Sequence, residues 1–272
     1  MKRFFSFLLL IAAFVWAPTM QAGSAPKRVK HHRQLSPAER VEQNRPDPLP
    51  VKSNAGKRAE VLMVDLSNPV RVNTKYREGI DVSRYQGVID WERVAKEGQI
   101  SYAYMKATEG AQLVDRTYAY NIKSARQAGI SVGSYHFYRP NISIEEQFLN
   151  LTATVLKEDQ DLVPMIDIET AGNVSNERLI SDLNIFLRWV TEHYGKKPLL
   201  YTYQNFYNKH LVGRISGYQW MIAKYQAEVP ILTDDLDYMM WQYTQTGRVP
   251  GVKGNVDRSC LMGNHSLIQI QM

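Results

Sequence analysis

The sequence is poor in cysteine: Cys260 is the only one among 272 residues. A single thiol cannot form an intramolecular disulfide, and it cannot supply the cysteine cluster of a structural zinc site. The sequence also lacks a G-x-G-x-x-G or P-loop motif after its first predicted strand, which argues against a nucleotide-binding fold. We therefore expect no disulfide framework, no cofactor and no required metal ion.

Excess positive charge is missing from most of the chain, although the net charge is +6. Residues 1–78 hold 14 Lys and Arg against 6 Asp and Glu, a local charge of +8, so the other residues hold 19 basic and 21 acidic side chains, a charge of −2. This distribution argues against nucleic acid as the main partner. The basic stretch could associate weakly with anionic surfaces such as a cell wall, although a solvated linker is the simpler interpretation.

The N-terminus has no apolar run long enough for a membrane span. Residues 4–17 are apolar and follow Lys2 and Arg3, which is the layout of a secretory signal peptide. Ala22 offers a cleavage point, so we predict a signal peptide over residues 1–22 and an exported protein, either periplasmic or secreted. Residues 23–77 are basic, polar and rich in proline, and we predict that they form a flexible linker.

From residue 78 onward, predicted strands and helices alternate, which is typical of parallel strands joined by helical crossovers. We predict strands at 79–83, 101–107, 130–137, 163–170, 198–203, 218–224, 239–243 and 255–258, and helices at 90–98, 115–128, 143–157 and 175–194. Residues 266–271 are a candidate for one further pairing. Eight strands predict an α/β fold of the trimmed (β/α)8 type over residues 78–272, a TIM-like barrel that lacks helices in its second half. A full barrel of this kind takes about 250 residues, more than this segment has.

Two carboxylates stand at the end of the fourth predicted strand. Asp167 and Glu169 are two residues apart, so on a strand they point to the same side, with Cα atoms about 7 Å apart. Their charges repel and burial disfavours ionisation, so one of the two pKa values should rise. A neutral carboxylic acid beside an ionised carboxylate is suited to the cleavage of a glycosidic bond. The alternative is a strand end with two solvated acids.

Further acids and aromatic rings gather at the same end of the predicted barrel. The first and last strands of a closed barrel are neighbours, so Asp81 and Asp257 should meet, and active sites of such barrels lie at the carboxyl ends of the strands. Each ring alone could be a core residue, but together the rings favour a groove in which they stack on sugars. The rings near strand ends are Tyr135, Phe137, Tyr138, Tyr201, Tyr203, Trp220, Tyr225, Trp241 and Tyr243.

Seven motifs resemble, in order, those of glycoside hydrolase family 25, the Chalaropsis-type lysozymes. They are GIDVSRYQG at 79–87, YMKATEG at 104–110, GSYHF at 133–137, PMIDIE at 164–169, WMIAKY at 220–225, WQY at 241–243 and NVDR at 255–258. The residues that follow Asp257 depart from the family pattern, so the resemblance leaves the register of the last strand open.

The resemblance implies an N-acetylmuramidase that cleaves the β-1,4 bond between N-acetylmuramic acid and N-acetylglucosamine in peptidoglycan, and we expect it to act as a monomer. It implies that Glu169 is the general acid, that Asp167 is the second carboxylate, and that Asp81 and Asp257 support them. We expect Asp167 to stay ionised; it could assist attack by the 2-acetamido group of the substrate, which we favour, or activate water. The substrate-binding residues that we predict are Tyr135, Phe137, Tyr138, Tyr201, Lys224, Tyr225 and Trp241.

Two alternatives remain open on sequence alone. The first is a noncatalytic glycan-binding module that uses the same barrel. The second is an exported interaction protein that binds through its basic segment.

Overall fold

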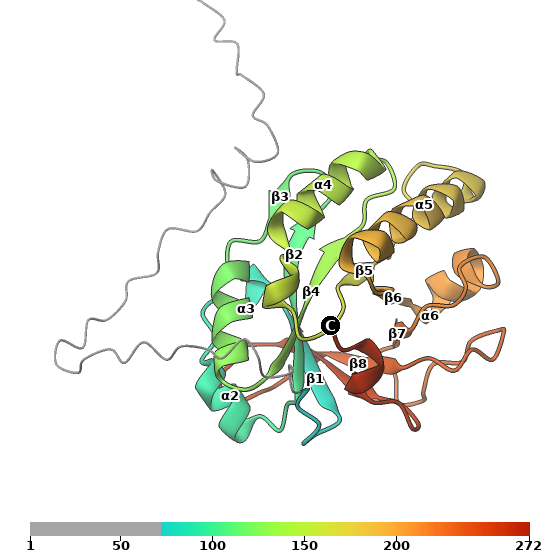
Figure 1. The fold of residues 1–272 in the computed structure, drawn as a ribbon. Helices are drawn as coiled ribbons and strands as arrows, with labels where there is room; N and C mark the ends of the chain where they lie inside the picture. The colour runs from blue at the N-terminus through green and yellow to red at the C-terminus, as the bar shows by residue number, and fades with distance from the viewer. Residues whose placement is uncertain (1–71) are drawn as a thin grey trace, which may run out of the picture. The chain divides into compact units, whose positions relative to one another are not determined.

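The computed structural model describes residues 72–272 (Figure 1). The predicted signal peptide and residues 23–71 of the predicted linker lie outside the described residues. Residues 72–77 contact the barrel: the backbone N–H of Asn73 donates to Ser131 Oγ (2.7 Å), and that of Tyr76 donates to Ser101 Oγ (2.6 Å). The Arg77 guanidinium donates to backbone carbonyls in the segment 261–265. The folded part of the chain therefore includes these last residues before the first strand.

Eight strands close into a barrel in the order β1-β9-β8-β7-β6-β5-β4-β2, with β1 and β2 paired to complete the ring. The strands are β1 (Glu78–Val82), β2 (Tyr102–Glu109), β4 (Ser131–Phe137), β5 (Met165–Asp167), β6 (Leu199–Tyr203), β7 (Trp220–Ala223), β8 (Met240–Gly247) and β9 (Val256–Leu261). The two-residue strand β3 (Leu113–Val114) pairs with β2 outside the ring. The predicted TIM-like α/β barrel is thus confirmed.

Strand β9 is the exception to the parallel arrangement. It runs antiparallel to both β1 and β8, whereas every other neighbouring pair in the ring is parallel. Only residues 248–255 connect β8 to β9, which is too short for the crossover that a parallel pair needs. Strands β8 and β9 therefore form a hairpin in place of a βαβ unit. The residues directly after Asp257, where the sequence departs from the family pattern, lie in the second strand of this hairpin.

Helices cover the first half of the barrel and become short in the second half, as the sequence predicted (Figure 1). The long helices are α2 (Trp91–Glu97), α3 (Tyr118–Gln127), α4 (Ile144–Thr154) and α5 (Asn176–Tyr194); the short ones are α6 (Gln204–Phe206), the π-helical η3 (Tyr207–Leu211), and the 3-10 turns η1 (Arg84–Gln86), η2 (Lys157–Asp159) and η4 (Leu267–Ile270). Because η4 occupies most of residues 266–271, the expected strand pairing of this segment is limited to one isolated bridge, which joins Leu162 to Gln271.

Side chains at the helix ends explain the observed boundaries. The Asp90 side chain accepts from the backbone N–H of Arg93 at the start of α2 (3.0 Å), as an N-cap residue does. Helix α5 ends at Gly195, whose φ of +76° is the left-handed conformation that glycine adopts without strain. Helix α3 begins three residues later than predicted because the Asp115 side chain accepts from the backbone and hydroxyl of Thr117 and forms a turn there.

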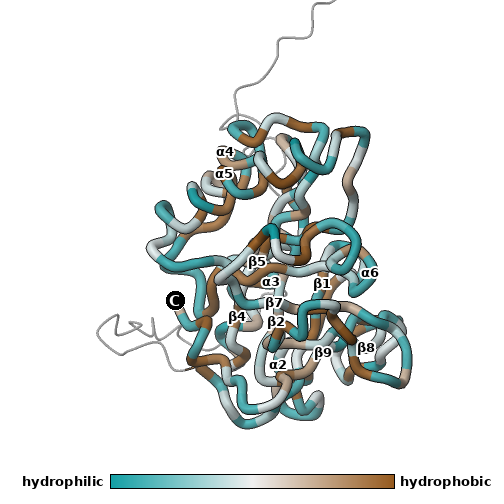
Figure 2. Tube along the Cα trace, turned by 90° about the vertical axis from the view of Figure 1, so that its right-hand side faces the viewer, coloured by the Kyte–Doolittle hydropathy of each residue, from teal (hydrophilic) through white to brown (hydrophobic). Residues whose placement is uncertain are grey.

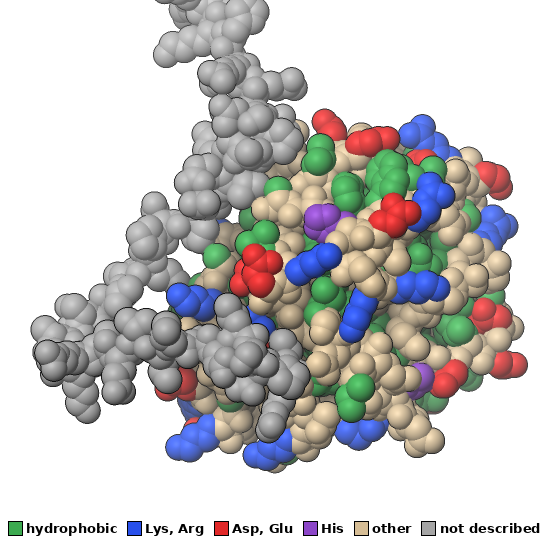
Figure 3. All heavy atoms as spheres, in the orientation of Figure 1, with side chains coloured by type: hydrophobic (Ala, Val, Ile, Leu, Met, Phe, Trp, Pro, Cys, Tyr) green, Lys and Arg blue, Asp and Glu red, His purple; other side chains and the backbone are tan. Residues whose placement is uncertain are grey.

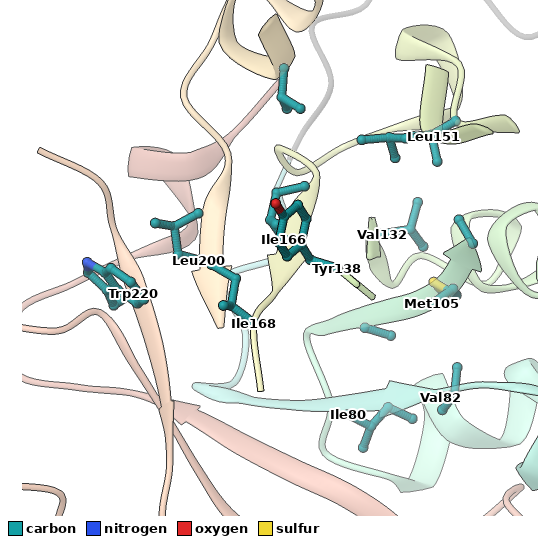
Figure 4. Close-up of a cluster of buried hydrophobic side chains, with 14 of the residues drawn as sticks. Ile80, Val82, Met105, Val132, Tyr138, Leu151, Ile166, Ile168, Leu200 and Trp220 are labelled. Atoms are coloured by element: carbon teal, nitrogen blue, oxygen red, sulfur yellow. The ribbon is translucent and has the colours of Figure 1, made fainter. Parts of the chain in front are cut away.

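Side chains on the strands alternate between two hydrophobic cores. Ile80, Ile166 and Leu200 face outward and pack with residues of the covering helices (Figure 4). Tyr102, Tyr104, Met165, Leu199 and Met221 belong to a second cluster, which fills the inside of the barrel. Most strands are therefore buried on both faces, and the hydrophobic segments in Figure 2 follow them.

Charged side chains of both signs are interspersed on the face drawn in Figure 3, which shows no large patch of a single sign. This matches the near-neutral charge that the sequence assigns to residues after 78. Within residues 72–272, no helix is long and apolar enough to cross a membrane.

Candidate active site

A cleft of about 210 Å³ opens at the carboxyl ends of the barrel strands, where an active site was expected. It contains all four acids that the sequence singled out, together with three of the predicted aromatic residues. Its lining residues are Asp81, Val82, Ser83, Tyr85, Gln86, Lys106, Tyr135, Phe137, Met165, Asp167, Glu169, Tyr201, Gln242 and Asp257.

The pairing of the strands brings these residues together. Asp81 on β1 lies directly opposite Asp257 on β9, as barrel closure predicted. Asp167 is the last residue of β5, where its neighbours across the sheet are Phe137 on β4 and Tyr201 on β6. Alternation places every second residue of each strand on the inside, so these side chains share the upper layer of the barrel interior.

Asp167 and Glu169 form a buried acidic pair at the centre of the cleft. Burial, followed by the neighbouring charge of Glu169, raises the pKa of Asp167 well above its usual value, and burial also raises the pKa of Glu169. The neighbouring charges disfavour ionisation of both carboxyl groups at once, so a pair of this kind tends to retain one proton. Asp167 is only 6% exposed and less accessible than Glu169, so burial disfavours its ionised form more strongly. The expectation that Asp167 stays ionised during catalysis remains a prediction.

Asp81 is held by a chain of hydrogen bonds from three strands. Both Tyr201 (2.8 Å) and Tyr225 (2.7 Å) donate their hydroxyls to Gln242 Oε1, and Gln242 Nε2 donates to Asp81 Oδ2 (2.7 Å). Two hydroxyl donors on Oε1 fix the amide orientation, so Nε2 must face Asp81. Burial raises the pKa of Asp81 to about 8 in spite of this bond, and it raises the pKa of Asp257 to about 6.

Two buried carboxylate oxygens of the cleft have no hydrogen-bond partner among the described residues: Asp81 Oδ1 and Asp167 Oδ1. Buried polar atoms of native proteins are nearly always paired, and exceptions are common where a ligand supplies the missing partner. N–H or O–H groups of a bound substrate would give each of these oxygens a donor.

Lys106 brings a positive charge to the rim of the cleft. Its Nζ lies 2.5 Å from Glu109 Oε2 and 5.1 Å from the ring centroid of Phe137. Arg139 contacts the same two residues, through an ion pair to Glu109 and with its guanidinium 4.4 Å from the Phe137 ring centroid. The two cations keep the carboxylate of Glu109 ionised, with a lowered pKa despite its partial burial.

Four residues predicted to bind substrate do not line the cleft: Tyr138, Lys224, Tyr225 and Trp241. Tyr138 follows the end of β4 and is buried against Phe186 of α5, on the outside of the barrel. Trp241 faces outward, because its strand neighbour Gln242 is the residue that faces inward, and its Nε1 donates to the Lys224 carbonyl. Lys224 Nζ donates to the carbonyl of Val229. Substrate binding by Tyr138, Lys224 and Trp241 therefore stays a prediction without support from the cleft, whereas the Tyr225 hydroxyl contacts the cleft residue Gln242.

The sequence analysis did not single out five lining residues of the cleft: Ser83, Tyr85, Gln86, Lys106 and Gln242. Ser83, Tyr85 and Gln86 belong to the motif at 79–87, and Lys106 alternates with Tyr102 and Tyr104, so the motif and the period of two could have identified them. Tyr85 is 78% exposed at the mouth of the cleft, which is unusual for a large ring unless it has a partner. Within residues 72–272, no group of three His, Cys, Asp or Glu side chains is arranged to hold a metal ion.

A closed barrel with paired acids in a ring-lined cleft defines a hydrolase that acts on sugars. The sequence model of glycosyl hydrolases family 25 matches residues 80–252, and the chain belongs to this family. It is a glycoside hydrolase, in agreement with the motifs above.

Known proteins of the family are similar over most of the described chain. An uncharacterised protein of Escherichia coli K12, YegX, is 34% identical over 205 residues, which are 74% of this chain and 75% of the relative. Lysozyme M1 of Streptomyces globisporus is 30% identical over 201 residues, 69% of this chain and 68% of that protein. The structure of a family 25 glycosyl hydrolase from Bacillus anthracis is 31% identical, covers 69% of this chain and 89% of its own, and superimposes with a TM-score of 0.64.

Proposed function

We propose that the protein is an exported lysozyme that hydrolyses the β-1,4 bond between N-acetylmuramic acid and N-acetylglucosamine in peptidoglycan. The observation that carries the proposal is the placement of Asp167 and Glu169 together in the cleft, where burial raises the pKa of both. Relatives that bear the name lysozyme support the choice of substrate. Export depends on the signal peptide expected over residues 1–22, and the monomeric state is likewise a proposal.

Glu169 is the proposed general acid, which protonates the glycosidic oxygen as the bond breaks. It is the more exposed member of the pair, so it can reach the leaving-group oxygen of a glycan that lies across the cleft. The proton that the pair retains is placed on Glu169 when the substrate acetamido N–H donates to Asp167, because that donor stabilises the ionised form of Asp167. A positioned general acid contributes a factor of about 10²–10⁴ to the rate.

The closeness of the two carboxyl groups supports substrate assistance over direct attack by water. An inverting pair is about 6.5–9.5 Å apart to leave room for water, and a retaining nucleophile lies about 5 Å from the acid. Asp167 and Glu169 are close enough for each to shift the pKa of the other, and the unpaired Asp167 Oδ1 can accept a bond from an acetamido N–H. In our proposal Asp167 therefore orients the acetamido group, whose oxygen attacks the anomeric carbon to give a cyclic intermediate that water then opens.

Asp81 and Asp257 are proposed to support Asp167 and not to react. Gln242 connects Asp81 to Tyr201 on β6 and to Tyr225, which follows β7, and these bonds fix the carboxyl in place. The unpaired Oδ1 atom of Asp81 is available to a polar group of the sugar that occupies the cleft.

The test is Glu169→Gln, measured by release of reducing ends from purified peptidoglycan. We expect a loss of at least about 100-fold, because the amide keeps the shape but cannot donate the catalytic proton. Glu192→Gln, on the exposed side of α5, is the matched control and should behave as wild type. Mass spectrometry of the wild-type products should identify N-acetylmuramic acid at the new reducing end.

Normal lysis by a folded Glu169→Gln variant would contradict the assignment of the acid. Binding of peptidoglycan by the wild-type protein with no new reducing ends would instead support the noncatalytic module. Circular dichroism of both variants shows whether the fold is retained.

A further inference from the structure

A second pocket, of about 600 Å³, lies beside the active-site cleft and shares no lining residue with it. Three loops form it, at the carboxyl ends of β2, β4 and β5. Its lining residues are Glu109, Gly110, Ala111, Gln112, Leu113, Arg139, Pro140, Asn141, Ile142, Glu146, Thr170 and Gly172. Thr170 lines the pocket and follows the proposed general acid Glu169 directly in the chain, so the pocket is adjacent to the catalytic pair.

A charged divider separates the pocket from the cleft. Lys106 and Phe137 line the cleft, Glu109 and Arg139 line the pocket, and these four residues contact one another. The bonds from Arg139 to Glu109 use Nε and Nη2, which leaves Nη1 without a hydrogen-bond partner among the described residues. A ligand that spans cleft and pocket would pass along this divider and meet the guanidinium.

The walls of the pocket are held in place by buried hydrogen bonds. The side chain of Gln147 on α4 accepts from the Arg139 backbone N–H (2.8 Å) and donates to the Arg139 carbonyl (3.0 Å). His136 Nε2 lies 3.3 Å from the same Gln147 oxygen, and the burial that lowers the pKa of His136 to about 4 keeps this ring neutral. Gly172, with φ of +59°, approaches Asn141 so closely that a Cβ there would overlap its side chain. The loop that carries Arg139 is therefore fixed before any ligand binds.

The composition of the pocket does not suit a further sugar. Sugar subsites use aromatic faces, and the twelve residues that line this pocket include none. They include instead a cation, Arg139, and two anions, Glu109 and Glu146, of which Glu109 is ion-paired with Arg139, next to apolar groups such as Ala111 and Ile142. Guanidinium groups bind carboxylates, and a carboxylate binds an ammonium group. This mixture matches a short peptide with free carboxylates and an amine.

We propose that this pocket binds the peptide that peptidoglycan carries on the lactyl group of its muramic acid, with a peptide carboxylate at Arg139 and the side-chain amine of the peptide's diamino acid at Glu146. The inference rests on the proposed function, because the muramic acid that occupies the cleft would carry the peptide across the divider. Arg139 and Glu146 then make the enzyme prefer glycan strands that retain their peptides.

The experiment compares two soluble substrates: uncrosslinked peptidoglycan strands with their peptides, and the same strands after an amidase has removed the peptides. We expect the wild-type kcat/KM to be at least about 10-fold higher on the peptide-bearing strands. Glu146→Gln should lower this ratio several-fold, while its kcat/KM on the peptide-free strands stays within about two-fold of wild type. Arg139→Gln should also lower the ratio several-fold, and only the ratio is compared for this variant because the Arg139 charge acts on the pKa of Glu169. Arg93→Gln removes a comparable exposed ion pair on α2 and should leave the ratio unchanged.

The two proposals can fail separately. Equal wild-type rates on both substrates would overturn the peptide pocket and leave the muramidase function intact. A ratio that both variants preserve would also overturn the pocket. Hydrolysis of neither substrate would refute the proposed function, and with it the inference that depends on it.

Discussion

Replacing Asp81 with asparagine should stabilise the protein at alkaline pH relative to wild type, although it removes a residue of the active site. Asp81 is 5% exposed, accepts one hydrogen bond from Gln242 and has a second oxygen with no partner among the described residues. Burial raises its pKa from 3.8 to about 8. Ionisation of this carboxyl therefore destabilises the folded state relative to the unfolded chain. An uncharged side chain at this position has no such effect.

The sign and size of the effect follow from proton linkage. Below pH 3.8 the carboxyl is protonated in both states, and between pH 3.8 and about 8 the unfolded chain loses the proton while the folded chain keeps it. Stability therefore falls as pH rises through this window, by about 1.4 kcal/mol per pH unit. From pH 5 to pH 8 the loss is about 4 kcal/mol, a large part of the total stability of an ordinary domain. The asparagine of the variant does not titrate, and its altered hydrogen bonding costs about 1–3 kcal/mol at every pH.

Urea unfolding of wild type and Asp81→Asn at pH 5 and pH 8 measures the effect. The difference in free energy of unfolding, variant minus wild type, should rise by several kcal/mol between the two pH values, and the constant hydrogen-bond cost cancels from this comparison. Glu92→Gln, which removes an exposed carboxylate on α2, should show no such rise. An Asp81→Asn difference that is the same at both pH values would refute the argument that burial keeps this carboxyl protonated.

Three further substitutions test the barrel and the rim of the cleft. Gly79→Ala should destabilise the protein by about 3 kcal/mol or more in urea unfolding, because a Cβ there would overlap a buried tyrosine ring. Tyr85→Ala should raise KM about 10-fold with little change in kcat if the exposed ring stacks on the glycan, whereas Trp241→Ala, outside the cleft, should change neither. Tyr104→Ala should admit water beneath the acids and lower their pKa values, which would move the alkaline limb of the pH–activity profile to lower pH.

The sequence predicted the meeting of the acids because closure of a barrel is a strong constraint. Once eight strands close, the first and last must be neighbours, and this alone placed Asp81 near Asp257. Asp167 and Glu169 both line the cleft as their i and i+2 spacing suggested, although β5 ends at Asp167 and Glu169 lies beyond the strand. Helix starts were equally local, since Asp90 and Ser175 each cap a helix with their own side chains.

The sequence could not predict which face of a strand is the inside when both faces are buried. In β8, Trp241 and Gln242 are adjacent, and either could have faced the cleft; Gln242 is the one that does. Apolar alternation distinguishes the faces only when one side meets water. Tyr138 is a related case: β4 ends at Phe137, so the alternation no longer applies one residue further on.

The raised pKa values of the cleft have a common structural origin in the layer of the barrel beneath it. Tyr102 and Tyr104 point inward from β2, where their hydroxyls donate to Ser259 Oγ (3.1 Å) and to the Val163 carbonyl (3.2 Å). The rings fit because glycines stand opposite them on the adjacent strands, at positions where any Cβ would overlap the ring. A floor of aromatic rings excludes water from below, and burial is the largest cause of the raised pKa of every acid in the cleft. Gly79 and Gly133 therefore help to raise the pKa values of the acids, because they make room for the two rings. They do so from one layer below the acids and without a side chain of their own.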